Sequence, residues 1–406
     1  MVWWVILLVT LTGVAIGRLP GLSMNRASIG VVGGTLLVLT GALSREAAWQ
    51  AIDMDTIVLL LAMMVVNVHL RLAGFFAWAA RQTVDARLAP QGLLALLMLV
   101  SGVLSALFLN DTIVLSFTPL VLEVVLAMGL PAPPFLIALA VSANIGSVAT
   151  LIGNPQNMLI GVASGISFQR FFLILGPVAL GGLVIAWLIL IGLYRRELAA
   201  RPPHPAPHPV LPLDRLLLWK SLGVTLFLVV VLWRGMPVSL AALSAAAWLL
   251  VTRRWSPDQI FREVDWGILV FFAALFVVTH AVESTGCSGR LLALLVGNGT
   301  LHIPSLAVIG LVLSNVVSNV PAVLLLRPLV THLPWAETAW LTLAMATTLA
   351  GNLTLLGSVA NLIVAETARH QGVILGFGAY LRAGVPITLG SLLWGIFWLS
   401  CCVGGG

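Results

Sequence analysis

The sequence predicts an all-α polytopic membrane protein with two inverted-topology repeats, about ten transmembrane helices, two re-entrant hairpins and two broken helices. Three observations support this fold class. Of the 406 residues, 60% are hydrophobic and only 8% are charged, whereas soluble domains carry about 25% charged residues. Apolar runs of about 17 to 25 residues, the length that crosses a bilayer as a helix, recur along the whole chain. Polar motifs also recur between the two halves of the sequence.

Ten apolar segments are expected to span the membrane as helices, because each contains few charged residues. They are 2–17, 28–43, 56–73, 134–165, 171–194, 215–233, 237–252, 266–283, 334–368 and 378–400. Two further apolar stretches, 91–129 and 303–331, are interrupted halfway by polar residues and are expected to form the re-entrant hairpins. The first segment lacks a basic leader and a small-residue cleavage site, so we interpret it as a retained helix and not as a signal peptide.

A Pro- and His-rich stretch at 195–214 separates a first repeat at 1–194 from a second repeat at 215–406, and we expect it to be a cytoplasmic linker. With this linker inside, fifteen basic residues fall in inside loops and four in outside loops, which agrees with the positive-inside rule. Both termini are then outside, and the expected location is a bacterial inner membrane. The basic residues are scattered singly and do not form a patch, so nucleic acid is not an expected partner. The three cysteines, including Cys287, have no metal or redox spacing.

Two motifs recur in the two halves. The segment that begins at Asn110, N-D-T-I-V-L-S-F-T-P-L-V, resembles the segment that begins at Asn319, N-V-P-A-V-L-L-L-R-P-L-V, at an offset of 209. The segment T-L-I-G-N-P-Q-N from Thr150 resembles T-L-L-G-S-V-A-N from Thr354 at an offset of 204. Internal repeats of inverted topology are typical of secondary transporters.

Four interruptions break the expected helices with Asn, Ser, Gly or Pro, at 109–112, 153–157, 318–321 and 357–361. Irregular backbone at membrane depth is tolerated only where it is buried in protein or lines a water-filled cavity. The helix N-termini created there favour anionic groups, and the freed carbonyls favour cations. We therefore expect the four interruptions to form one composite substrate and ion site near the bilayer midplane.

The candidate site residues lie at these interruptions or just before them. They are Asn110, Asp111, Thr112, Thr150, Gly153, Asn154, Asn157, Ser318, Asn319, Thr354, Gly357, Ser358 and Asn361. An Asn carboxamide has both donors and an acceptor and could serve an oxyanion or Na⁺, or it could only cap a broken helix. The hydroxyls could instead bond a carbonyl four residues earlier. The two glycines are expected to serve backbone conformation or close approach.

Asp111 has no acidic counterpart in the second repeat, where Val320 stands at the matching position. A carboxylate at that depth is costly unless it is paired or functional. It could carry a proton, hold a cation or cap the following helix. Arg327, in the second hairpin, could pair with an anionic substrate or neutralise a nearby acid. Glu123 and Glu366 could equally belong to structural ion pairs.

The two hairpin tips and two broken helices resemble the ion transporter superfamily, in particular its citrate-transporter-like and arsenite-permease group. The resemblance covers essentially the whole chain. In that group the tips carry Ser-Asn-Thr-like triplets. It implies a homodimer in which a transport half moves the site past a scaffold half, and some arsenite permeases recruit a partner ATPase. The first tip resembles arsenite permeases, whereas Val320 in place of Thr argues against dicarboxylate binding.

We therefore expect a secondary active transporter of a small anion or oxyanion, arsenite-like or another inorganic anion ahead of carboxylates. Alternating access would be coupled to H⁺ or Na⁺, with no cofactor and no metal site other than Na⁺ at the same loops. The alternative is a Na⁺/H⁺ antiporter, because the charge of Asp111 opposes an anion, although it would not oppose neutral arsenous acid. An enzyme or a primary pump is not expected, because the sequence lacks H-E-x-x-H, G-x-S-x-G and G-x-x-x-x-G-K-[ST] motifs.

Overall fold

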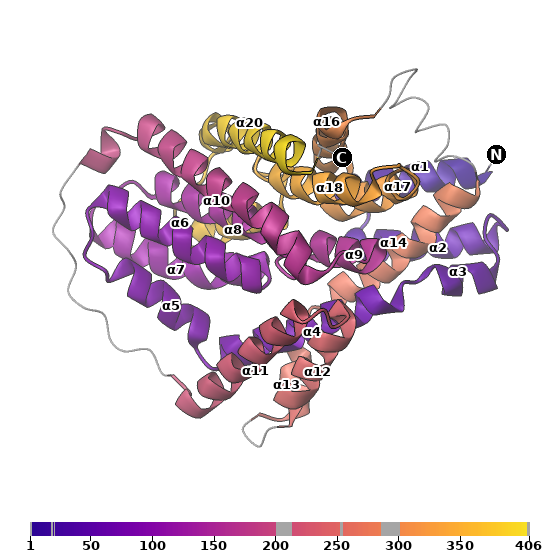
Figure 1. The fold of residues 1–406 in the computed structure, drawn as a ribbon, viewed down its shortest axis with the longest axis horizontal. Coiled ribbons are helices and arrows are strands. Elements are labelled where there is room, and N and C mark those ends of the chain that lie inside the picture. The colour runs from indigo at the N-terminus through magenta and orange to yellow at the C-terminus, as the bar shows by residue number, and fades with distance from the viewer. Residues whose placement is uncertain are drawn as a thin grey trace.

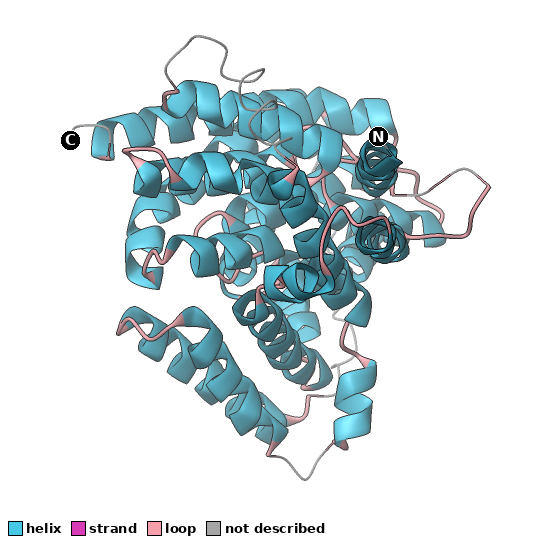
Figure 2. Cartoon of the chain, turned by 90° about the vertical axis from the view of Figure 1, so that its right-hand side faces the viewer, coloured by secondary structure: helices cyan, strands magenta, loops and turns pink. Residues whose placement is uncertain are grey.

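The computed structural model describes residues 2–17, 19, 21–199, 213–251, 255–285 and 301–403. All regular elements in these ranges are helices, which pack into one body (Figure 2). Seven of them are long and apolar enough to cross a membrane. The predicted all-α fold is therefore confirmed. Cys287 and most of the predicted linker lie outside the described residues.

The helices of the first half agree with the predicted segments, including both arms of the first hairpin and the broken helix. They are α1 (Val2–Ile16), α2 (Arg26–Leu39), α3 (Arg45–Ala51), α4 (Met54–Leu72), α5 (Phe75–Val84), α6 (Pro90–Leu107), α7 (Asn110–Ala127), α8 (Ala132–Ser147), α9 (Pro155–Ser164) and α10 (Phe168–Leu193), followed by the 3₁₀ turn η1 (Glu197–Ala199). The short helices α3 and α5 were not predicted, because neither is long enough to give a membrane-spanning hydropathy signal.

The second half has the same order of long and broken helices. They are α11 (Arg215–Trp233), α12 (Val238–Leu250), α13 (Pro257–Arg262), α14 (Trp266–Ser284), α16 (Ile303–Val317), α17 (Asn319–Thr331), α18 (Ala336–Ala350), α19 (Val359–His370) and α20 (Phe377–Cys402). The helices α1, α2 and α12 are 15, 14 and 13 residues long, which is shorter than the predicted segments.

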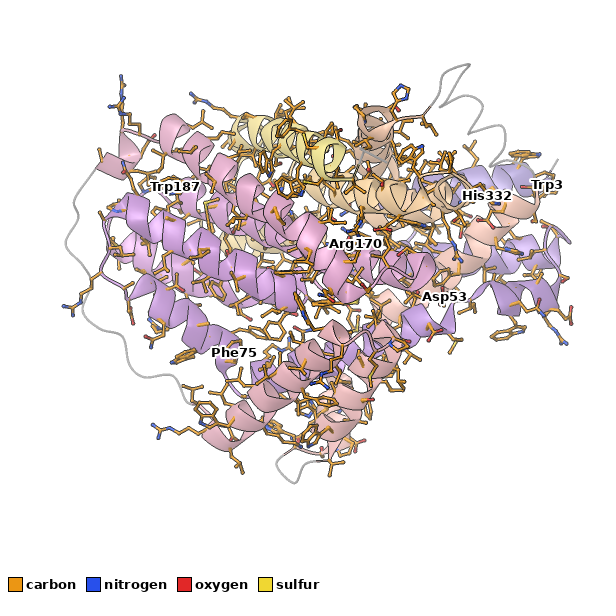
Figure 3. The ribbon with its side chains drawn as sticks, viewed as in Figure 1. Trp3, Asp53, Phe75, Arg170, Trp187 and His332 are labelled. Atoms are coloured by element: carbon orange, nitrogen blue, oxygen red, sulfur yellow. The ribbon has the colours of Figure 1, made fainter. Side chains whose placement is uncertain are left out.

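Corresponding helices begin in the same way. The side chain of Asp53, labelled in Figure 3, caps α4 by accepting a hydrogen bond from the backbone N–H of Thr56 at 3.1 Å. Asp265 caps α14 in the same manner, with the N–H of Ile268 at 3.2 Å. A carboxylate at this position pairs with an otherwise unsatisfied donor and with the positive end of the helix dipole.

The helix pairings of the first half recur in the second. α4 packs on α12 and α2 packs on α14, while α6 packs on α8 and α16 packs on α18. α10 and α20 lie side by side (Figure 1). Prolines inside helices also correspond at the offset of 209, with Pro119 in α7 matching Pro328 in α17, and Pro177 in α10 matching Pro386 in α20. The two halves of the chain therefore match in helix order, helix pairings and the positions of these prolines.

The centre of the molecule is formed by α8 and α18, which are buried on all sides from Phe135 to Ser147 and from Thr338 to Ala350. A helix that is apolar all round is expected in such a place. α6 crosses α8 very closely, since a Cβ added to Gly146 would lie 2.1 Å from the carbonyl oxygen of Gly102. Glycine is thus required at this crossing by close approach of two backbones.

The described helices form two groups. One group contains α1, α2, α4, α11, α12 and α14, and the other contains α6 to α10 and α16 to α20. The groups contact each other where α4 meets α9 and where α14 meets α17. The ends of the broken helices and hairpins face this boundary, so the boundary positions the candidate site.

Candidate functional site

A cavity of about 740 Å³ lies at the boundary between the two groups of helices. The first residues of α7, α9, α17 and α19 all line it, and α2, α4 and α14 form the opposite wall. The first turn of a helix has N–H groups without intrahelical partners and carries a partial positive charge. Four helix starts at one cavity favour solutes that offer hydrogen-bond acceptors.

The tip of the first hairpin is anchored from two directions. The backbone N–H of Asn110 donates to the carbonyl of Gly153 at 3.2 Å, which ties the tip to the break between α8 and α9. The side-chain amide of Asn110 donates to Oδ1 of Asn144 at 3.1 Å. The neighbouring Asp111 is half-buried and lines the cavity.

The tip of the second hairpin contains a strained backbone. Ser318, between α16 and α17, has φ 77° and ψ 161°, a region that is otherwise almost restricted to glycine. Oδ1 of the next residue, Asn319, accepts a hydrogen bond of 2.5 Å from Ser314. Such strain persists where the surrounding contacts hold it, and it is frequent at ligand sites.

Replacing Ser318 by Gly is expected to raise the free energy of unfolding by about 1 kcal/mol, because glycine adopts this backbone conformation without strain. Chemical unfolding of the purified protein in detergent would measure the change. Ser244, half-buried in the middle of α12, gives a matched control. Ser244→Gly should lower the free energy of unfolding by about 0.5 kcal/mol, as expected for an ordinary helix position. A loss of stability in both variants would show that Ser318 is not strained.

The two breaks are closed by the same pair of hydrogen bonds in each repeat. A carboxamide in the first turn of the second helix donates to two carbonyls of the break, ten and seven residues earlier. These bonds run from Asn157 to Ser147 (3.0 Å) and Thr150 (3.1 Å), and from Asn361 to Gly351 (2.7 Å) and Thr354 (3.0 Å). The recurrence of Asn at this place therefore has a structural explanation, because it satisfies carbonyls that a broken helix leaves free.

The breaks lie earlier than predicted, at 148–154 and 351–358 instead of 153–157 and 357–361. The reason is helix capping. Asn154 accepts a hydrogen bond from the N–H of Asn157 at 2.8 Å, and Ser358 accepts one from the N–H of Ala360 at 3.2 Å. Pro155 follows as the first residue of α9, a position at which its missing N–H is tolerated. The predicted positions were thus wrong by a few residues.

Asn144, in the buried α8, joins the two repeats. Its Nδ2 donates to Oδ1 of Asn352 at 3.0 Å and to Oδ1 of Asn361 at 3.1 Å. Its Oδ1 accepts from Asn110 and from the hydroxyl of Ser358, both at 3.1 Å. One carboxamide therefore connects the first hairpin tip with the break of the opposite repeat.

Charged side chains of both signs line the cavity. Arg71 on α4 is paired with Glu263, and Asp265 is the cap of α14. Arg26, on α2, lies on the same wall. Among the described residues, the carboxylate of Asp111 makes no ion pair. The hairpin tips therefore present amide and hydroxyl groups and one carboxylate, and the arginines lie across the cavity.

A match to a known protein family identifies the family of this chain. Residues 5–350 match the family described as "Citrate transporter". The chain belongs to the citrate transporter family. This membership confirms the resemblance found in the sequence, and it makes the protein a membrane transporter and not an enzyme.

The similarity between this citrate transporter family member and its relatives extends over nearly the whole length of both proteins. The silicon efflux transporter LSI3 of Oryza sativa subsp. japonica is 33% identical, over 91% of this chain and 91% of that protein. A 46 kDa membrane protein of Mycobacterium leprae (strain TN) is 31% identical, over 94% and 95%. The crystal structure of the Alcanivorax borkumensis YdaH transporter has the same fold, with a TM-score of 0.62, 16% identity and coverage of 99% and 98%.

The predicted site residues of this citrate transporter family member fall into two sets. Those that line the cavity are Asn110, Asp111, Thr112, Ser318, Asn319, Gly357 and Ser358. Those that do not line it, and that form or close the breaks behind it, are Thr150, Gly153, Asn154, Asn157, Thr354 and Asn361. Contact of any of them with a solute stays a prediction.

Three charged residues considered in the sequence lie away from this cavity. Glu123 pairs with Arg81 at 3.6 Å, and Glu366 pairs with Arg369 at 2.6 Å, so both take part in ion pairs. Arg327 lines a second, smaller cavity instead.

Sequence reasoning missed the polar residues at the centre of the site. Asn144, Thr348 and Asn352 are buried between the repeats, and Gln156 lines the cavity. Thr348 donates to Oδ1 of Asn157 at 3.4 Å, which mirrors the bond between Asn144 and Asn361. A signal was available, because Asn144 and Thr348 are matching polar positions at the offset of 204 within otherwise apolar helices.

Proposed function

We propose that the protein is a secondary active transporter of a small inorganic oxyacid, arsenite-like in character, and that it works by alternating access coupled to H⁺. The observation that carries this proposal is the composition of the cavity at the hairpin tips. It combines four helix starts and the side chains of Asn110 and Asn319 with the carboxylate of Asp111. A hydroxylated acid such as arsenous or silicic acid offers both acceptors and donors to such a set.

The charges of the cavity argue against carboxylates. A di- or tricarboxylate needs cationic partners at close range, and Arg is the usual partner of carboxylates. Arg71 is already paired with Glu263, Arg26 lies across the cavity from the hairpin tips, and Asp111 would repel an anion from the tips. Arsenous and silicic acid are uncharged near neutral pH and escape this repulsion. The rice relative's description as a silicon efflux transporter supports a neutral hydroxylated acid as the substrate class.

Asp111 is the proposed coupling group. It is an ionisable residue at the start of a helix with membrane-spanning character, and such residues are frequent in proton relays. Protonation would remove its charge when a solute enters the cavity, and deprotonation would restore it. The runner-up function is Na⁺/H⁺ antiport, in which the same carboxylate binds Na⁺ and H⁺ alternately.

The remaining features of the proposal come from the family resemblance and, for the orientation of the termini, from the distribution of basic residues. We expect a homodimer in a bacterial inner membrane, with both termini outside. The group that contains α4, α12 and α14 would be the scaffold, and the group that contains the hairpins and broken helices would move. A partner ATPase is not needed for gradient-driven transport, and purified protein alone should suffice.

Reconstitution in liposomes tests the proposal. Uptake of arsenite, silicic acid, phosphate, sulfate, citrate and succinate would be measured under imposed proton or sodium gradients. The expected result is proton-dependent accumulation of arsenite or silicic acid and little movement of citrate. If no solute moves but Na⁺ collapses an imposed pH gradient, the antiporter is the correct function.

A further inference from the structure

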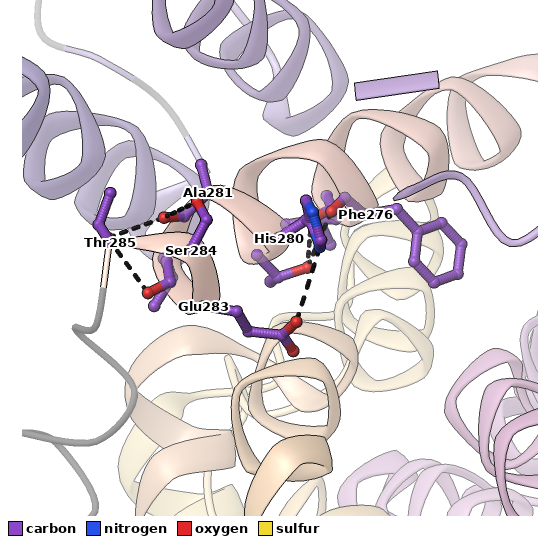
Figure 4. Close-up of polar contacts among 9 residues, drawn as sticks. Phe276, His280, Ala281, Glu283, Ser284 and Thr285 are labelled. Carbon is purple, nitrogen blue, oxygen red and sulfur yellow. Dashed lines mark hydrogen bonds and ion pairs between the residues drawn. The ribbon is translucent and has the colours of Figure 1, made fainter. Parts of the chain in front are cut away.

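A second cavity, of about 270 Å³, lies farther along α17 from the hairpin tip than the first. His280 and Glu283 of α14 line it, and Figure 4 shows their side chains turned toward each other, with Nδ1 and Oε2 3.7 Å apart. Their side chains are 41% and 38% exposed, so the cavity reaches the protein surface. Gln50, from α3, also lines it.

The two cavities follow one crevice between α14 and α17. On α14, Ile268 and Phe272 line the first cavity, and Phe276 and Glu283 line the second. Successive residues of this set are four or seven positions apart and therefore share one face of the helix. On α17, Val320 lines the first cavity, whereas Leu324 and Arg327 line the second, again on one face. The helices pack against each other, so the cavities lie in sequence along the same path.

A short apolar barrier separates the cavities. It consists of Phe272 and Phe276 on α14 and of Val320 and Leu324 on α17, which are 1%, 3%, 9% and 2% exposed. On each helix the barrier residues are four positions apart, which is about one turn or roughly 6 Å. A small displacement of α17 along α14 would therefore connect or separate the two cavities.

The second cavity contains groups that match a hydroxylated acid. Arg327 makes no ion pair among the described residues, although it shares the cavity with Glu283. The guanidinium and the carboxamide of Gln50 are donors, and Glu283 is an acceptor. The hydroxyl of Thr279 is engaged with its own helix, donating to the carbonyl of Leu275 at 2.7 Å. A guanidinium that makes no ion pair among the described residues, in the same cavity as a carboxylate, is suited to a solute that carries both O–H and oxygen groups.

We propose that the second cavity is a binding vestibule for the transported oxyacid on the opposite face of the membrane, with Arg327 as its main donor. This inference rests on the proposed function for the identity of the solute. It assigns Arg327 a place on the transport path but outside the site at the hairpin tips. Phe272, Phe276, Val320 and Leu324 form the closed barrier between the two faces.

Site-directed labelling tests the location. Cysteines would be placed singly at Ala27, in the first cavity, and at Ala47, in the second, in a protein whose natural cysteines are replaced by serine. A membrane-impermeant maleimide is expected to label Ala27→Cys from one face and Ala47→Cys from the other. Labelling of both from the same face would overturn the proposal.

Silicic acid tests the binding. It is expected to slow the labelling of Ala47→Cys, and the concentration for half-protection should rise about tenfold in Arg327→Gln, since a charged donor is lost. Arg327→Lys, which keeps the charge, should retain most of the protection. Absence of protection, or equal protection with and without Arg327, would contradict the vestibule. Uptake of silicic acid by the unmodified protein is measured in parallel. If uptake fails, the proposed function fails, while the sidedness of labelling still decides the location of the second cavity.

Discussion

Replacement of Asp111 by Asn is expected to reduce proton-driven uptake of arsenite or silicic acid to the level of protein-free liposomes. Asn has nearly the shape of Asp and can form similar hydrogen bonds, but it cannot exchange a proton. Asp111 is half-buried at the cavity and makes no ion pair among the described residues, so no neighbouring cation there compensates its charge. Flux under an imposed pH gradient would measure the effect.

Asp53 offers a matched control for this substitution. It caps α4 and does not line either cavity. Asn caps helices about as well as Asp, so Asp53→Asn should keep the flux of the unmodified protein. Uptake by Asp111→Asn that still follows the pH gradient would remove Asp111 from the coupling mechanism.

Replacement of Asn144 by Ala is expected to lower the free energy of unfolding by about 2 to 4 kcal/mol. Four hydrogen bonds of 3.0 to 3.1 Å converge on this carboxamide, and interhelical hydrogen bonds in membrane proteins contribute about 0.6 to 1.7 kcal/mol each. The loss should also abolish transport, because Asn144 holds the first hairpin tip against the break of the second repeat. Unfolding in mixed detergent micelles and uptake in liposomes would measure the two effects.

Asn67→Ala is a control with the same chemical change. Asn67 is also a buried Asn in an apolar helix, but among the described residues its Nδ2 donates only to the carbonyl of Met63 in the same helix, at 2.7 Å. Its replacement should change stability by less than about 1 kcal/mol. Equal destabilisation by both substitutions would show that the hydrogen bonds of Asn144 between helices contribute no more to stability than the bond of Asn67 within one helix. An Asn144→Ala variant that is as stable and active as the unmodified protein would refute the role of Asn144.

The hairpins and broken helices could be predicted because local sequence determines them. A run of apolar residues interrupted by Asn or Gly indicates where a helix stops, and the repeat supplies the same evidence twice. The recurrence of Asn157 and Asn361 was recognised in this way. Their side-chain amides donate equivalent hydrogen bonds to carbonyls of the two breaks, which explains why Asn recurs there. The start of α9 was placed too late, because capping by Asn154 depends on backbone geometry that a motif does not reveal.

The centre of the site could not be predicted in the same way. Asn144 meets residues that are 208 and 217 positions away in the chain, so its partners depend on how the two repeats pack. The direction in which a side chain faces depends on the same packing. Asn110 lines the cavity while Asn157 lies behind it, although both belong to the repeated motifs. Arg327, for which the sequence left open pairing with an anionic substrate or with a nearby acid, lies one helical turn beyond the barrier residue Leu324 for the same reason.

Proton coupling is most directly tested by recording the internal pH of liposomes that contain the purified protein when a gradient of arsenite or silicic acid is applied in the absence of a pH gradient and of Na⁺. The proposed mechanism predicts a change in internal pH that follows the solute and disappears in Asp111→Asn. Solute movement without any change in pH, or a change in pH that requires Na⁺ and no solute, would contradict it.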